Sequence, residues 1–103
     1  MFSLYFSKHE FERSETAKRL RIDNSLTHMA SSNIQYLVDN LLHPLRKILM
    51  RPIHIKSGYR CPELNTAVRG SATSAHMIGQ AADIKVDGMS AEELATYIVH
   101  HNL

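Results

Sequence analysis

The chain has 103 residues, of which 44% are hydrophobic and 21% are charged, a composition typical of a folded domain. A chain of this length buries only about two-thirds of the surface that its unfolded form exposes, so we expect a single domain around one modest core. Twelve Lys and Arg residues against ten Asp and Glu residues leave a formal charge of +2, too small an excess to indicate a nucleic-acid partner, and no apolar run is long enough to indicate a membrane partner.

The first half of the sequence predicts helices. Ser14 is a suitable N-cap for a short helix that ends near Leu20, and residues 23–25 predict a turn. Pro44 lies inside the longest periodic segment and predicts a kink or a lost hydrogen bond there. In that segment apolar residues recur at steps of three and four, as on the buried face of a helix, at Ile34, Leu37, Val38, Leu41, Leu42, Leu45, Ile48 and Leu49.

The second half predicts two strands and two further helices. Residues 53–57 and 81–86 have strand character, Pro62 begins a short helix through Val68, and residues 70–74 form a loop. Ser90 and Glu93 form a capping box that opens the last helix. Because two strands alone make a marginal sheet in water, the sequence predicts an α+β fold whose small antiparallel sheet is incomplete. We therefore expect residues 1–103 to be a single, C-terminally truncated domain.

The residue types that carry chemistry are concentrated in residues 74–83. Imidazole and carboxylate groups are both zinc ligands, and His76 and Asp83 can approach one metal ion if Gly79 lets the chain bend back. By itself this pair is weak support for a metal site, because an exposed His and a loop carboxylate are common on protein surfaces.

Two adjoining motifs make the pattern specific. Ser74-x-His76-x-x-Gly79-x-Ala81-x-Asp83 resembles the signature of the zinc D-alanyl-D-alanine carboxypeptidase family, and residues 57–68 are similar to the segment that precedes it in the phage-type cell-wall peptidase branch. The resemblance covers nearly the whole chain. It implies a hedgehog/DD-peptidase-like domain that uses Zn²⁺ to hydrolyse D-Ala-containing peptidoglycan stem peptides, as a carboxypeptidase or as an endopeptidase.

The resemblance also implies roles for individual residues. His76 and Asp83 correspond to two zinc ligands, and Arg60 corresponds to the catalytic arginine that holds the substrate and stabilises charge on the scissile carbonyl. The alternative for Arg60 is a structural salt bridge. Tyr59 and Ser74 are candidate substrate-binding residues, although we favour a supporting role for both. Cys61 is interpreted as a small buried residue beside a helix start and not as a ligand.

The sequence departs from the family where the site should be completed. The family supplies a third ligand from a His-x-His pair and a general base from a nearby Glu, and neither segment occurs in these 103 residues. We therefore expect the chain alone to be weakly active or inactive. The alternative is a non-catalytic remnant, or a metal- or peptidoglycan-binding module of the same fold, as in the signalling domain of hedgehog proteins. A third interpretation, a helical nucleic-acid-binding module, is disfavoured by the small charge excess.

The sequence also bears on compartment and assembly. The first residues lack the basic lead and the apolar stretch of a secretory signal, and the single cysteine excludes an internal disulfide. We expect a monomer that is cytoplasmic as synthesised and acts on the cell wall if another system releases it.

Overall fold

The computed structural model describes residues 2–103 and has the α+β character predicted from the sequence. Its two strands are β1 (His54–Ser57) and β2 (Asp83–Lys85). Helices surround them in the order α1 (Lys8–Glu12), α2 (Glu15–Leu20), α3 (His28–Leu37), the π-helical segment η1 (Val38–Leu42), α4 (His43–Leu49), α5 (Pro62–Ala67), the 3₁₀ helix η2 (Ala75–Ile78) and α6 (Ala91–His100).

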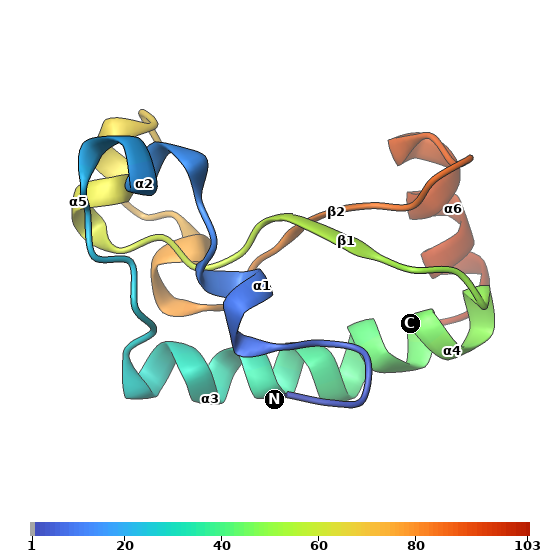
Figure 1. The fold of residues 1–103 in the computed structure, drawn as a ribbon. Helices are drawn as coiled ribbons and strands as arrows, with labels where there is room; N and C mark the ends of the chain where they lie inside the picture. The colour runs from blue at the N-terminus through green and yellow to red at the C-terminus, as the bar shows by residue number, and fades with distance from the viewer. Residues whose placement is uncertain (1) are drawn as a thin grey trace.

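The long helical rod below the strands in Figure 1 consists of α3, η1 and α4 in direct succession. The regular α-helical pattern changes just before Pro44, as predicted. Pro44 has no N–H to donate, and the His43 N–H bonds to the Val38 carbonyl five residues back, which widens the turn. The rod therefore stays continuous past a residue that would otherwise break it.

The two strands form an antiparallel sheet in which Ile55 pairs with Ile84 and Ser57 with Asp83. A bulge between Ile55 and Ser57 shifts the register at the end where Asp83 lies. Strand β2 is shorter than the predicted residues 81–86. Pairing stops because β1 ends at Ser57, after which the chain turns to α1 and the Tyr59 N–H donates to the Phe11 carbonyl at 2.8 Å.

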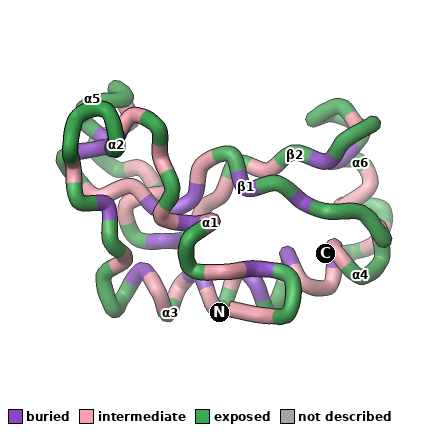
Figure 2. Tube along the Cα trace, viewed as in Figure 1, coloured by how far each residue is buried: buried purple, intermediate pink, exposed green. Residues whose placement is uncertain are grey.

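The core lies between the helical rod, the sheet and α1, and Figure 2 shows buried positions on the facing sides of these elements. Most of the apolar positions predicted on the rod supply its lower layer, but the prediction was wrong for Ile48, whose side chain is exposed on α4. The most deeply buried side chains of the core are Phe6, Phe11, Ile34, Val38, Leu42, Leu45 and Val86. Burial of this set, at about 25 cal/mol per Å² of apolar surface, is the main force that holds the sheet against the rod.

The predicted helix starts are confirmed by their caps. Ser14 Oγ accepts from the Ala17 N–H, and Ser90 and Glu93 form the reciprocal capping box of α6. A second capping box, between Ser7 and Glu10, opens α1, which the sequence had not singled out. No helix within residues 2–103 is long and apolar enough to cross a membrane.

Candidate metal centre

His76 lies on the short 3₁₀ helix η2, directly after the loop predicted for residues 70–74. Ser74 Oγ accepts from the His76 backbone N–H at 3.2 Å and so caps this short helix. Gly79 ends it with a left-handed φ of 77°, and a Cβ there would overlap the backbone of Ala30 on α3. Only glycine combines that turn with so close an approach to the rod. The bend that the sequence assigned to Gly79 is therefore present.

The imidazole of His76 is held in one orientation. Its Nδ1 lies 2.6 Å from the Gly58 carbonyl oxygen, and only 12% of the side chain is exposed. A carbonyl can only accept, so Nδ1 carries the proton, and in the neutral ring Nε2 keeps a free lone pair. This is the arrangement in which a second partner fixes the tautomer of a metal-binding histidine.

Asp83 is the first residue of β2, and its carboxylate lies on the Nε2 side of His76. Asp83 Oδ2 is 3.6 Å from His76 Nε2, too long for a hydrogen bond. Two ligands on one tetrahedral zinc ion, each at about 2.0–2.1 Å, are separated by about 3.3 Å. The pair therefore fits two corners of such a site with little adjustment. No third His, Cys, Asp or Glu joins this pair within residues 2–103.

Arg60 borders the same carboxylate, because its Nη2 lies 3.7 Å from Asp83 Oδ2. Neutral acceptors hold the rest of the guanidinium: Nε donates to Ser57 Oγ and Nη1 donates to Asn65 Oδ1, each at 3.3 Å. The long ion pair is the structural alternative considered for Arg60, and 62% of the Asp83 side chain is exposed, so solvent weakens it. The uncharged side chains of Ser57 and Asn65 thus orient the Arg60 guanidinium beside the candidate metal ligands.

Three residues that orient this site were not identified from the sequence. Asn65 is buried and also donates to the Ser71 carbonyl, so it links Arg60 to the loop before His76. Gly70 leaves the space for it, since a Cβ at position 70 would overlap the Asn65 side chain. Asn24 donates to the Tyr59 carbonyl and accepts from the Cys61 N–H, on either side of Arg60. The position of Asn65 inside the matched segment 57–68 is the one sequence signal that could have revealed it, whereas Asn24 lies in the turn predicted at residues 23–25 and carries no such signal.

The two candidate substrate-binding residues differ in accessibility. Tyr59 is 4% exposed and belongs to the core, and burial raises the pKa of its hydroxyl above the usual value. Ser74 is half-buried and caps η2. Both placements favour the supporting role, and contact with a substrate stays a prediction for each. The half-buried Cys61 caps α5, with Sγ accepting from the Leu64 N–H.

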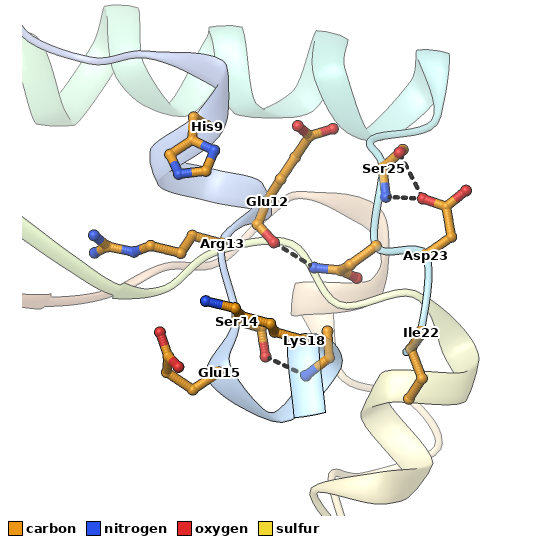
Figure 3. A pocket seen from close by; sticks show the side chains of 11 residues that line it. His9, Glu12, Arg13, Ser14, Glu15, Lys18, Ile22, Asp23 and Ser25 are labelled. Atoms are coloured by element: carbon orange, nitrogen blue, oxygen red, sulfur yellow. Dashed lines mark hydrogen bonds between the residues drawn. The ribbon is translucent and has the colours of Figure 1, made fainter. Parts of the chain in front are cut away.

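A cavity of about 390 Å³ lies beside α1 and α2 and is shown in Figure 3. Charged side chains of both signs line it: the cations Arg13 and Lys18, and the carboxylates Glu12, Glu15 and Asp23. Several of these groups are already engaged: Glu12 accepts from the Leu26 N–H at 2.7 Å, and Asp23 accepts from Ser25. With three carboxylates against two cations, this cavity has no excess of positive charge that would attract an anion.

Comparison with known proteins identifies the family of the chain. The family model described as Peptidase M15 matches residues 4–103. The chain belongs to the Peptidase M15 family. Membership implies a metallopeptidase, generally zinc-dependent, which is consistent with the donor types of His76 and Asp83. No curated protein and no solved structure matches the chain.

Proposed function

We propose that this M15 chain carries the zinc-binding and substrate-holding part of a peptidase that hydrolyses D-Ala-containing peptidoglycan stem peptides, as a carboxypeptidase or an endopeptidase on the hedgehog/DD-peptidase-like fold. The observation that carries the proposal is the 3.6 Å approach of His76 Nε2 to Asp83 Oδ2, with Nδ1 of the same ring held by Gly58. The resemblance of residues 74–83 to the carboxypeptidase signature supports the choice of substrate.

His76 and Asp83 would hold a Zn²⁺ ion, which when bound would act as a Lewis acid and lower the pKa of bound water. The protein's own contribution is orientation. The Gly58 carbonyl keeps Nδ1 protonated and Nε2 free, and Ser57 and Asn65 fix Arg60 with donors left over for a substrate oxygen. A permanently charged guanidinium in this position stabilises negative charge that develops on a peptide carbonyl.

A second candidate function is a non-catalytic metal- or peptidoglycan-binding module of the same fold. The observation in its favour is that residues 2–103 offer no third His, Cys, Asp or Glu near the pair. An active site would take its third ligand and its general base from outside these residues. Release of D-Ala from a stem peptide by the zinc-loaded chain would favour the peptidase, whereas zinc binding without turnover would favour the module.

The test of the site is zinc affinity at neutral pH for the wild type, His76→Ala and Asp83→Ala. We expect each change to weaken binding at least tenfold, because even loss of an outer-shell partner typically costs about 10–100-fold. His28→Ala and Asp39→Ala are matched controls, since both residues are exposed and lie on or next to the rod. Zinc binding that is equally strong in all five proteins would overturn the proposal.

A further inference from the structure

A second cavity, of about 280 Å³, lies on the side of Arg60 that faces α2. Arg13, Lys56 and Arg60 line it, together with a single carboxylate, Glu15. The buried side chains of Tyr59 and Leu64 contribute apolar surface to the same cavity. It therefore combines three cations with an apolar wall, unlike the cavity of Figure 3, where carboxylates outnumber cations.

Two of the three cations of this cavity have no carboxylate partner. Within residues 2–103 neither Arg13 nor Lys56 takes part in an ion pair, and the single ion pair of Arg60 is the long one to Asp83, at 3.7 Å. Arg13 makes one long contact, 3.5 Å from Nη2 to the Ile55 carbonyl. Unpaired cations in a concave site with apolar walls create a positive potential that attracts an anion.

We infer that the cavity lined by Arg13, Lys56 and Arg60 is a subsite for a carboxylate of the peptide substrate, next to the His76–Asp83 pair. The inference rests on the proposed function, because Arg60 is the residue that the cavity shares with the metal centre. The volume is below the roughly 300–1,000 Å³ of pockets that enclose whole small ligands, so the cavity suits a single residue that carries a carboxylate, at its side chain or at the C-terminus. Arg13 and Lys56 then act as specificity-determining residues.

Binding of four short peptides to the zinc-loaded chain tests this inference by calorimetric titration. The peptides are N-acetyl-Glu-D-Ala-D-Ala and N-acetyl-Gln-D-Ala-D-Ala, each with a free or an amidated C-terminus. Comparing the Glu peptides with the Gln peptides measures the effect of a side-chain carboxylate on affinity. Comparing free with amidated peptides measures the effect of the C-terminal carboxylate. We expect at least one carboxylate to improve affinity about three- to tenfold in the wild type, the range for a partly exposed charge-assisted contact.

The variants Arg13→Gln and Lys56→Gln should reduce this preference, and Glu15→Gln should increase it, because it removes the only carboxylate that lines the cavity. Arg13, Glu15 and Lys56 are exposed, so the changes leave the core intact. Lys47→Gln on α4 removes the same charge from an exposed position outside the cavity and should have no effect.

Equal affinity for all four peptides would overturn the subsite, as would a preference that Arg13→Gln and Lys56→Gln alter no more than Lys47→Gln does. Absence of any peptide binding would overturn it as well. Failure of the proposed function has a different signature: zinc binding would be indifferent to His76→Ala, while the carboxylate preference and its loss in the cavity variants could persist.

Discussion

Replacing Asn24 by Ala should lower the free energy of unfolding by about 3 kcal/mol, because this buried side chain joins three backbone segments. Its amide donates to the Glu12 and Tyr59 carbonyls, each at 2.9 Å, and its Oδ1 accepts from the Cys61 N–H at 2.8 Å. Each hydrogen bond contributes about 1 kcal/mol net, and groups left unpaired in a buried setting cost more. For a domain of this size, the loss corresponds to a fall in Tm of about 12–24 °C.

Thermal and urea unfolding, followed by circular dichroism, would measure this loss. Asn40→Ala is the matched control, because Asn40 is exposed and makes a single hydrogen bond, 2.8 Å to the Tyr36 carbonyl. We expect the control to change the unfolding free energy by less than about 0.5 kcal/mol. If Asn24→Ala costs no more than Asn40→Ala, the reasoning that this amide holds the Arg60 segment in place is wrong.

Two further changes probe the supports of the site and of α6. Gly79→Ala should cost about 2–4 kcal/mol in unfolding free energy, since φ is 77° and the new Cβ would overlap the Ala30 backbone. Gly88→Ala also has a positive φ, of 83°, but its new Cβ would meet only the Arg51 side chain, at an ordinary contact distance of 3.5 Å, so it should cost only about 1 kcal/mol in the same denaturation assay. Hydrogen bonds from Ser90 hold the pKa of Glu93 below its usual 4.5. A lowered folded-state pKa means that this stabilisation is present above pH 4.5 and is lost as the pH falls through the folded value. Glu93→Gln should therefore flatten the acid side of the stability–pH profile, and an unchanged profile would contradict the assignment.

Local patterns in the sequence were sufficient for most of the helices and for the choice of His76 and Asp83 as candidate metal ligands. Ser14, Ser90 and Pro62 mark helix starts through groups within a few residues, and Pro44 alone predicts the interrupted rod. The His76–Asp83 spacing is likewise contained in one short segment, bent at Gly79. These features depend on contacts between near neighbours in the chain, which a sequence pattern records directly.

Contacts between distant residues decided the rest. The bond from His76 to Gly58 spans 18 residues, and the bonds from Asn24 to Tyr59 and Cys61 span 35 and 37, so no local pattern predicts them. The early end of the sheet and the 3₁₀ conformation around His76 follow from where β1 leaves its partner and from the packing of Gly79 against Ala30. The sequence by itself determined which groups could bind a metal ion. Their orientation required the folded chain, because only burial of the core brings those distant backbone groups within hydrogen-bonding reach.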